Sequence, residues 1–414
     1  MRVIADLHIH SKYSRATSNK MDVETISQQA KIKGIDIVGT GDFTHPKWIT
    51  ELKAKLTKEG DIYSYQGTSF IPQTEVSSIY SDGTKVRKIH NCILCPDLDT
   101  AEQVTEWFKT KGRVDYDGRP IFKIPCPELV EKIMEINKDN FVFPAHIWTP
   151  WFSLLGSESG FNSVEECYKD QAKHIHALET GLSSDPKMNW RLSQLDKFAL
   201  LSNSDCHSPW PYRLGREANV FDLKERSYNE LINAIKNKDK KKFLYTLEVD
   251  PNYGKYHYDG HRAHDISFSP EESIKHNNIC PVCNQRLTLG VLHRVQELAD
   301  RPNGFIPKDA IPFKKILPLQ EILGVVKGSQ VFSVTVSKIY NNLISAFGNE
   351  MNILFDVSFE KLKEASDENI AKAIILNREE KVKVKPGYDG VYGEPSFGEE
   401  IKITKRKQSN LTEF

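Results

Sequence analysis

The 414-residue sequence lacks several features that mark common protein classes. No apolar run approaches the roughly 20 residues that cross a membrane, and the first residues are not the basic and then apolar stretch of a secretory signal. We therefore expect a cytoplasmic protein without a membrane partner. The sequence also lacks the GxxxxGK[ST] loop that cradles nucleotide phosphates, which argues against an ATP-driven enzyme.

Excess charge and paired cysteines are missing as well. Lys+Arg and Asp+Glu both number 56, so the formal net charge is +0 and provides no electrostatic case for nucleic acid. The 7 cysteines are odd in number, and their spacing does not indicate a disulfide framework. Reduced thiols with one zinc site fit this pattern better.

The chain predicts three parts. Up to about residue 245, apolar runs such as Val3–His8 and Ile35–Gly39 alternate with helical patterns, of which residues 22–33 are the clearest. This alternation is typical of an α/β fold with a parallel sheet, open or closed into a barrel. We expect a catalytic α/β domain over residues 1–248, a zinc-binding module over 249–302, and a mainly helical domain with a loose tail over 303–414.

Residue types that bind metals recur after successive candidate strands. In α/β barrels, catalytic groups gather at the C-terminal ends of the strands. Imidazoles bind borderline metals, and carboxylates bridge two cations, which can then activate water and stabilise the oxygens on phosphorus. One histidine at a strand end would be ordinary, but eight such residues predict a site for divalent ions and phosphoester hydrolysis. The eight are His8, His10, Asp42, Glu75, His90, His146, Asp205 and His207.

Spacing suggests individual roles within this set. His8 and His10 lie on the same side of an extended segment, which suits one ion, and Asp205 and His207 repeat that spacing. We interpret Glu75 as the carboxylate that bridges two ions. Asp205, Glu75 and His207 are the predicted catalytic residues.

The motif Asp6-Leu-His-Ile-His10, with the later metal-type residues, resembles the polymerase-and-histidinol-phosphatase superfamily. This resemblance implies a distorted seven-stranded β/α barrel that holds two or three divalent ions, which would be Zn, Mn or Mg. Two positions depart from the pattern. Many members place a histidine after the aspartate, where this chain has Phe43, and a further histidine near the position of Ala16. We therefore expect one of the three metal positions to be altered.

Longer segments are similar to the endonuclease Q family, and this similarity covers nearly the whole chain. It implies a metal-dependent endonuclease that cuts DNA 5′ to deaminated bases (uracil, hypoxanthine and xanthine) and to abasic sites. It also implies that the zinc-binding module helps to grip DNA. The segments are Pro144–Phe152, Glu179–Pro186, Met188–Ser193, Ser202–Pro209, Gly290–Arg294, Glu297–Pro302 and Pro386–Gly393.

Aromatic residues follow several strand ends. An enzyme that tests a base usually extrudes it into a pocket and stacks it on aromatic rings. Some of these residues directly follow His146, and we expect one of them to line the lesion site, although ordinary core packing is the alternative for each. The candidates for contact with DNA or with a base are Trp148, Trp151, Phe152, Trp190 and Arg191.

A second metal site is indicated further along the chain. Cys280-Pro-Val-Cys283 is half of a zinc knuckle, and an HxxH pair precedes it by 15 residues. His257 and His293 are rival ligands, and a turn with two free thiols is the alternative. The predicted structural zinc ligands are His261, His264, Cys280 and Cys283.

The chain end carries one more motif. Gln408, Leu411 and Phe414 form a QxxLxxF pattern that resembles a sliding-clamp-binding peptide. Two other functions compete with the repair endonuclease: a phosphatase of the same superfamily that acts on a small phosphomonoester, and a non-catalytic DNA-binding repair factor. The additional module argues against the first, and the near-complete ligand set argues against the second.

Overall fold

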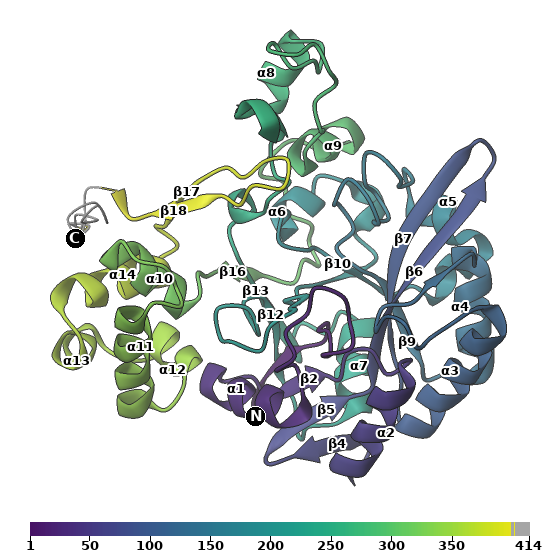
Figure 1. Cartoon of the computed structure of the whole chain (residues 1–414), viewed down its shortest axis with the longest axis horizontal. Helices are drawn as coiled ribbons and strands as arrows, with labels where there is room; N and C mark the ends of the chain where they lie inside the picture. The colour runs from purple at the N-terminus through teal and green to yellow at the C-terminus, as the bar shows by residue number, and fades with distance from the viewer. Residues whose placement is uncertain (399–400, 402–414) are drawn as a thin grey trace, which may run out of the picture.

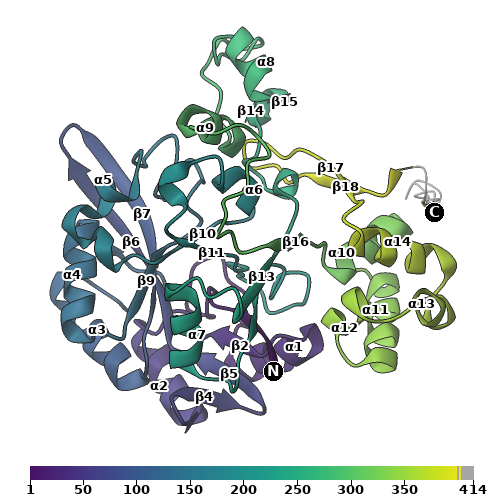
Figure 2. The same cartoon turned by 180° about the vertical axis from the view of Figure 1, so that it is seen from behind.

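The computed structural model describes residues 1–398 and 401. The α/β class is confirmed: Figure 1 shows a body of strands and helices, a group of helices at its left, and a small protruding module at its top. Figure 2 shows the same protrusion from behind. In the described part of the chain, no helix combines the length and apolarity needed to cross a membrane.

The largest sheet contains the first strand of the chain. Three of its neighbouring strands, β1, β2 and β5, are parallel, whereas β12 runs antiparallel to both β1 and β13. The order of strands is β16 (Phe313–Lys315), β13 (Phe243–Glu248), β12 (Ala218–Asp222), β1 (Arg2–Asp6), β2 (Ile37–Gly39), β5 (Thr68–Ile71), β4 (Ile62–Tyr65) and β3 (Thr57–Glu59).

A second sheet has the order β8 (Ile121–Phe122), β6 (Gln73–Asp82), β7 (Lys85–Leu94) and β9 (Phe141–Pro144). The predicted parallel arrangement does not extend through this sheet: β6 and β8 are parallel, but β7 is antiparallel to both β6 and β9. Only Gly83 and Thr84 separate β6 from β7, and the positive φ of Gly83 (59°) allows the tight turn. His90 consequently lies within β7 rather than at a strand end, and Glu75 lies near the start of β6.

The strands come together around a common centre. The pair β10 (Ala177–Glu179) and β11 (Ala199–Leu201) is parallel. Backbone hydrogen bonds join β10 to the end of β9, from Ile147 N to Glu179 O (3.0 Å), and join the ends of β11 and β1, from Asp205 N to His8 O (3.0 Å). The hydrogen-bonded ladders of the described residues form separate sheets, and the seven-stranded barrel stays a prediction.

The helices of the body pack outside these strands (Figures 1 and 2). The predicted helix over residues 22–33 is confirmed: the side chain of Asp22 accepts a hydrogen bond from Thr25 N at its start, and Gly34 ends it with a φ of 91°. The helices are α1 (Val23–Lys33), α2 (Pro46–Lys55), α3 (Leu98–Lys111), α4 (Cys126–Ile136), α5 (Val164–Tyr168), α6 (Pro186–Asn189) and α7 (Tyr228–Lys236), with short 3₁₀ turns at Lys169–His174 and Ser193–Leu195.

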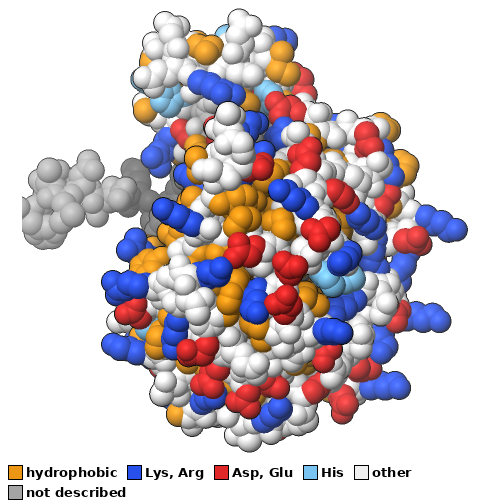
Figure 3. Space-filling view, turned by 90° about the vertical axis from the view of Figure 1, so that its right-hand side faces the viewer, with side chains coloured by type: hydrophobic (Ala, Val, Ile, Leu, Met, Phe, Trp, Pro, Cys, Tyr) orange, Lys and Arg blue, Asp and Glu red, His pale blue; other side chains and the backbone are white. Residues whose placement is uncertain are grey.

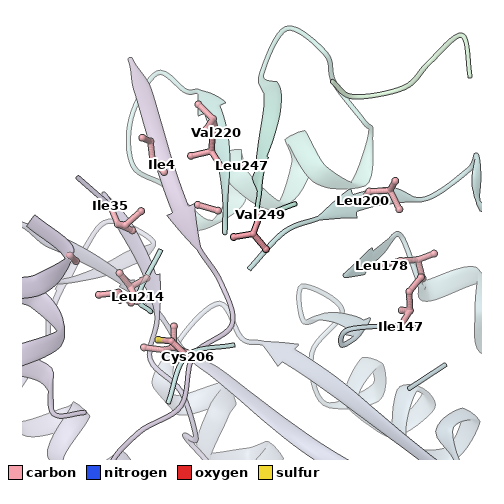
Figure 4. Close-up of a cluster of buried hydrophobic side chains, with 14 of the residues drawn as sticks. Ile4, Ile35, Ile147, Leu178, Leu200, Cys206, Leu214, Val220, Leu247 and Val249 are labelled. Carbon is pink, nitrogen blue, oxygen red and sulfur yellow. The ribbon is translucent and has the colours of Figure 1, made fainter. Parts of the chain in front are cut away.

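Apolar side chains of these elements form a continuous core. Ile4, Val220 and Leu247 come from three neighbouring strands of the large sheet. Cys206, which stands between two predicted metal ligands in the sequence, is fully buried, and Figure 4 shows its sulfur near this core. Cys206 therefore packs in the core between two residues of the predicted metal site.

The protruding module lies between the body and the C-terminal helices in sequence. Its elements are a 3₁₀ turn (Pro251–Tyr253), β14 (Asp259–His261), a second 3₁₀ turn (Arg262–His264), β15 (Ile266–Phe268), α8 (Pro270–Lys275) and α9 (Val291–Leu298). The strands β14 and β15 form an antiparallel pair.

The C-terminal region is mainly helical and then returns to the module. Its helices are α10 (Leu319–Lys327), α11 (Val334–Phe347), α12 (Glu350–Phe355), α13 (Phe359–Ala365) and α14 (Glu368–Arg378), and a hairpin of β17 (Lys383–Lys385) and β18 (Glu394–Ser396) follows. The turn of this hairpin contacts the module, because Gly387 N donates to Asn252 O (2.8 Å). The chain therefore crosses from the helices back toward the body.

One buried ion pair joins the helices to the body. Lys33 at the end of α1 is 2.6 Å from Glu350 Oε1 in α12, and both side chains are buried. Lys33 Nζ also donates to Pro211 O (2.7 Å), and Tyr340 OH donates to Glu350 Oε2 (2.9 Å). This network connects three segments that are far apart in the sequence.

Candidate active site

Six of the eight predicted metal-binding residues come together at the centre of the body. They form two groups that share Glu75, and within each group the ligand atoms lie within 4.8 Å of one another. One group is His8, His10, Glu75 and Asp205, and the other is Glu75, His90 and His146. We call these six residues the active-site cluster.

Glu75 lies between the two groups. Its Oε2 is 3.3 Å from His10 Nε2 and 3.8 Å from His8 Nε2, whereas its Oε1 is 2.6 Å from His90 Nδ1 and 3.2 Å from His146 Nε2. Burial raises the pKa of Glu75, but the charges of His90 and Arg119 hold it well below its usual range. An ionised carboxylate with one oxygen toward each group is the arrangement that a bridging ligand requires.

The cluster fits divalent metal ions. His8 Nε2 is buried without a hydrogen-bond partner, and it lies 3.7 Å from Asp205 Oδ1 and 3.8 Å from Glu75 Oε2. An unpaired buried nitrogen costs about 1–3 kcal/mol, and a cation among these atoms would satisfy it. Mixed imidazole and carboxylate ligands suit Zn, Mn or Fe, whereas calcium prefers sites made only of oxygen ligands.

Glu179 orients two of these ligands and was not selected from the sequence. Its carboxylate oxygens are both 3.1 Å from His8 Nδ1, and they accept hydrogen bonds from His146 N (2.7 Å) and Asn203 Nδ2 (2.8 Å). A proton on His8 Nδ1 leaves the lone pair of Nε2 toward the cluster. The position of Glu179 at the end of β10 was the sequence signal that could have found it.

Asp42 serves His10 in the same way. Its Oδ1 is 3.1 Å from His10 Nδ1, on the side of the ring opposite the cluster. Its Oδ2 accepts hydrogen bonds from Ser11 N, Ser11 Oγ and Ser14 Oγ at 2.6, 2.7 and 2.9 Å. The structure therefore places Asp42 outside both ligand groups, behind a ligand.

His207 also lies outside both groups. Its ring is 4.4 Å from the ring of His10, and its Nδ1 is 3.1 Å from the carbonyl oxygen of Asp205. The side chain is 30% exposed, which places it at the open side of the cluster. At the two positions that depart from the superfamily pattern, Phe43 is buried in the core and Ala16 has a positive φ of 58°.

Three residues at strand ends have unusual backbone conformations. Asp42, His146 and Asp205 have φ angles of 43°, 30° and 44°. Residues other than glycine rarely adopt a positive φ, and such backbone strain persists only where the surrounding structure enforces it. Here it occurs at two ligands of the cluster, His146 and Asp205, and at Asp42, which lies behind His10.

Arg119 is a second site residue that the sequence analysis missed. Its Nη1 is 3.2 Å from Glu75 Oε2, and its side chain is 27% exposed. It precedes β8 in a segment with no metal-type motif. The only sequence signal was a lone arginine, and surface arginines are common.

A cavity of about 210 Å³ opens beside the cluster. Three parts of the chain line it, because the module and the C-terminal hairpin both reach the open side of the body. Lining residues include His146, Asp205, His207 and Arg216 from the body, Lys255 and Tyr256 from the module, and Tyr392 from the hairpin.

The predicted zinc ligands of the module also converge. The ring nitrogens His261 Nδ1 and His264 Nδ1 are 3.2 Å apart, Cys283 Sγ is 3.4 Å from His261 Nδ1, and Cys280 Sγ is 3.6 Å from His264 Nδ1. All four ligand atoms lie within 4.8 Å of one another. We call these four residues the knuckle cluster. Two sulfurs and two imidazoles are a donor set typical of structural zinc.

The rival ligands lie elsewhere. His293 Nδ1 is 2.5 Å from Asp259 Oδ2, and His257 Nδ1 is 3.1 Å from the carbonyl oxygen of Ser183. Neither belongs to the knuckle cluster.

Two solved structures are similar to this chain over nearly its whole length. The crystal structure of the lesion-specific endonuclease PfuEndoQ from Pyrococcus furiosus is 34% identical, has a TM-score of 0.86, and covers 99% of this chain and 98% of its own. A structure of endonuclease Q with a 27-mer duplex that carries an abasic lesion at the active site is 33% identical, with a TM-score of 0.88 and 99% coverage of both chains.

This chain belongs to the endonuclease Q family. The family predicted from the sequence motifs is confirmed, and with it the predicted enzyme class, a metal-dependent endonuclease and therefore a hydrolase.

Two curated relatives are uncharacterized proteins. MJ0043 of Methanocaldococcus jannaschii is 34% identical over 257 residues, which are 60% of this endonuclease Q chain but only 31% of the relative. YqxK of Bacillus subtilis is 27% identical over 409 residues, which are 95% of this chain and 98% of that protein. The family model of the MJ0043 C-terminal domain matches residues 318–381, which contain α10–α14.

The aromatic candidates of this endonuclease Q chain divide by exposure. Trp148 is buried and its Nε1 donates to Asn189 Oδ1 (2.8 Å), and Trp190 is buried with its ring edge-on to Phe313. Both therefore pack in the core of the free protein. Arg191 is half-buried, and its carbonyl oxygen accepts backbone hydrogen bonds at 3.1 Å.

Two candidates lie nearer the opening. Trp151 is 40% exposed, and its ring is edge-on to Tyr256, which lines the cavity. The ring of Phe152 is 4.9 Å from the ring of His90. Of the five candidates, Trp151 thus contacts a residue of the cavity wall and Phe152 a residue of the active-site cluster.

Basic and acidic side chains are interspersed on the face of this endonuclease Q chain that Figure 3 shows. The view agrees with the formal net charge of +0. DNA contact would therefore depend on the placement of individual cations around the site rather than on a field of one sign.

Proposed function

We propose that this protein is a DNA repair endonuclease that hydrolyses the phosphodiester 5′ to deaminated bases, namely uracil, hypoxanthine and xanthine, and to abasic sites. The observation that carries the proposal is the cluster in which Glu75 turns one oxygen toward each of two ligand groups. Two-metal sites of this kind suit an in-line displacement at phosphorus. The abasic lesion at the active site of a 33% identical endonuclease Q supports damaged DNA as the substrate.

The active-site cluster would hold two or three divalent ions, of Zn, Mn or Mg. When bound, these ions supply Lewis-acid activation of water and of the phosphate. The chain's own residues prepare the ligands: Glu179 and Asp42 hold the Nδ1 protons of His8 and His10, so that both Nε2 lone pairs face inward. Asp205 and His207, on the open side, are the proposed catalytic residues together with Glu75.

The cavity beside the cluster is the proposed place for the damaged nucleotide. Its walls include Tyr256 and Tyr392, and Trp151 lies beside Tyr256. Stacking of an extruded base on an aromatic ring contributes about 1–3 kcal/mol. Since an abasic site has no base to stack, these rings are expected to influence cleavage at deoxyuridine more than cleavage at an abasic site.

The proposal also covers the protruding module and the C-terminal peptide. We propose that the knuckle cluster binds one structural Zn and that the module helps to hold DNA, because the module lines the cavity with Lys255 and Tyr256. The proposed sliding-clamp peptide with Gln408, Leu411 and Phe414 lies outside the described residues.

The decisive experiment uses end-labelled duplexes with one deoxyuridine, one deoxyinosine or one abasic site, beside undamaged DNA and a chromogenic phosphomonoester, in Mn²⁺ or Mg²⁺. We expect one nick immediately 5′ of each lesion. Asp205→Ala should reduce the rate on the order of 10³-fold, because the cluster loses a ligand whose effect is several kcal/mol. The exposed Asp309 provides a matched control, and Asp309→Ala should nick normally.

Other outcomes would redirect the proposal. Turnover of the phosphomonoester without a nick would make the protein a small-molecule phosphatase. Binding of damaged DNA without either reaction would make it a non-catalytic repair factor. Equal cleavage of undamaged DNA would contradict lesion specificity while retaining the nuclease.

A further inference from the structure

Arg119 lies where the active-site cluster meets solvent. Its Nη1 is 3.2 Å from Glu75 Oε2, the carboxylate oxygen that faces the group of His8, His10 and Asp205. Its side chain is 27% exposed, so Arg119 contacts the cluster and is not sealed from solvent.

The segment that carries Arg119 is held firmly against the first strand end. Asp117 Oδ1 accepts hydrogen bonds from Arg119 N (3.1 Å) and Arg15 N (3.2 Å), and Gly118 N donates to Tyr13 O (3.0 Å). A Cβ atom on Gly118 would lie 2.4 Å from Asp42 Oδ2, so only glycine allows this close approach. The backbone that carries Arg119 is therefore packed against Asp42, the residue that orients His10.

Arg119 differs chemically from the other partners of Glu75. Those partners are histidines in the described chain, and each can offer a nitrogen lone pair to a metal ion. A guanidinium stays protonated and has no acceptor, so it cannot be a ligand. Its planar donors instead match the oxygens of a phosphate, often in pairs.

Neutralising Glu75 does not account for Arg119. The four imidazoles around this carboxylate are neutral when they offer lone pairs to metal ions, and the divalent ions themselves would compensate its negative charge. A fixed cation that is partly exposed at the edge of such a site is suited to an anion that arrives from solvent. In the proposed reaction, that anion is the phosphodiester.

We propose that Arg119 is a catalytic residue that contacts a non-bridging oxygen of the scissile phosphate and stabilises the charge that develops there. This inference rests on the proposed function. In the reaction, a water oxygen bonds to phosphorus and loses its proton, and the P–O3′ bond breaks. The departing 3′ oxygen takes up a proton, and Arg119 remains protonated throughout.

The test compares Arg119→Gln, Arg119→Ala and Arg119→Lys with the wild-type enzyme on deoxyuridine-containing duplex. We expect Arg119→Gln to lower kcat about 10²–10³-fold, the usual cost of removing one donor to a developing oxyanion. Arg119→Lys should recover part of this loss, and added methylguanidine should partly restore Arg119→Ala. The control is Arg113→Gln, an exposed arginine on the same segment between α3 and β8, with unchanged rates.

Two measurements separate catalysis from structure. Elemental analysis should find the same metal content in wild-type and Arg119→Gln protein. Fluorescence anisotropy should show that a neutral methylphosphonate at the cleavage position weakens binding by wild-type protein but much less by Arg119→Gln protein.

Each failure has its own meaning. A wild-type enzyme that does not nick damaged DNA overturns the proposed function, and the role of Arg119 with it. A wild-type enzyme that nicks, together with Arg119→Gln at the same rate, overturns the role of Arg119 alone. Loss of metal from Arg119→Gln would make the residue a support for the ligands and would also overturn the inference.

Discussion

The described part of the chain contains two clusters of metal-type side chains that are assembled in opposite ways. The knuckle cluster takes all four residues from positions 261–283, whereas the active-site cluster takes six residues from positions 8–205. In both, the ligand atoms of a group lie within 4.8 Å of one another. The knuckle cluster needs little more than a hairpin and a turn, while the active-site cluster needs the correct order of several strands.

The two clusters also differ in their ligand types and in how open they are. The knuckle cluster has two thiols and two imidazoles, a set that closes around one ion. The active-site cluster has carboxylates at its centre, a cavity of about 210 Å³ at its side, and Glu179 and Asp42 behind its histidines. A site whose ligands are close in the sequence can be predicted from their spacing. An open catalytic site also depends on residues far away in the sequence that orient its ligands.

The largest effect is expected from removing the thiols of the knuckle cluster, which tests whether the two clusters bind metal independently. Cys280→Ser combined with Cys283→Ser should remove one zinc per chain and increase hydrogen exchange over residues 259–289, because small zinc modules lose their fold without the metal. Metal in the active-site cluster should remain. Elemental analysis and hydrogen exchange measure both quantities. Retention of that zinc in the double variant would contradict the proposed ligand set.

A second, smaller effect tests whether distant residues support the active-site cluster. Lys33→Met leaves Glu350 buried without its partner, and such a change costs about 3–5 kcal/mol of unfolding free energy. Lys33 Nζ also donates to Pro211 O, in the loop that follows His207, so nicking should fall while the zinc of the module stays bound. Denaturant unfolding and nicking rates measure the two effects.

The matched control for this variant lies on the same helix. Lys31 is exposed in the last turn of α1, and Lys31→Met should leave stability and nicking unchanged. Equal behaviour of the two variants would show that the buried ion pair does not support the site.

The smallest effect concerns orientation of a ligand. Glu179→Gln keeps the shape of the side chain but removes the charge that holds the Nδ1 proton of His8. We expect metal affinity to fall about 10–100-fold, as for other residues behind a ligand. Titration with Mn²⁺ followed by nicking measures this affinity. Glu158→Gln, at an exposed carboxylate, is the control, and an unchanged affinity in Glu179→Gln would contradict its role.

The sequence predicted much of the framework because strands and helices have their own periodicities. Helix α1 was predicted with both of its ends, and the α/β class was correct. The antiparallel hairpin of β6 and β7 was missed, because the apolar residues of a strand do not show whether the neighbouring strand runs parallel or antiparallel to it. Because of this hairpin, His90 lies in the middle of β7.

By itself, the sequence determined the local features of this protein: the caps of α1, the paired spacing of His8 and His10, the four residues of the knuckle cluster, and the motifs of its family. Only the tertiary structure decided which oxygens of Glu75 face which histidines, that Asp42 lies behind His10, and that Glu179 and Arg119 belong to the site. The physical reason is separation along the chain. Backbone geometry places neighbours within a few residues, whereas the contacts of Glu75 with His8, Arg119 and His146 exist only after the strands have packed in their final order.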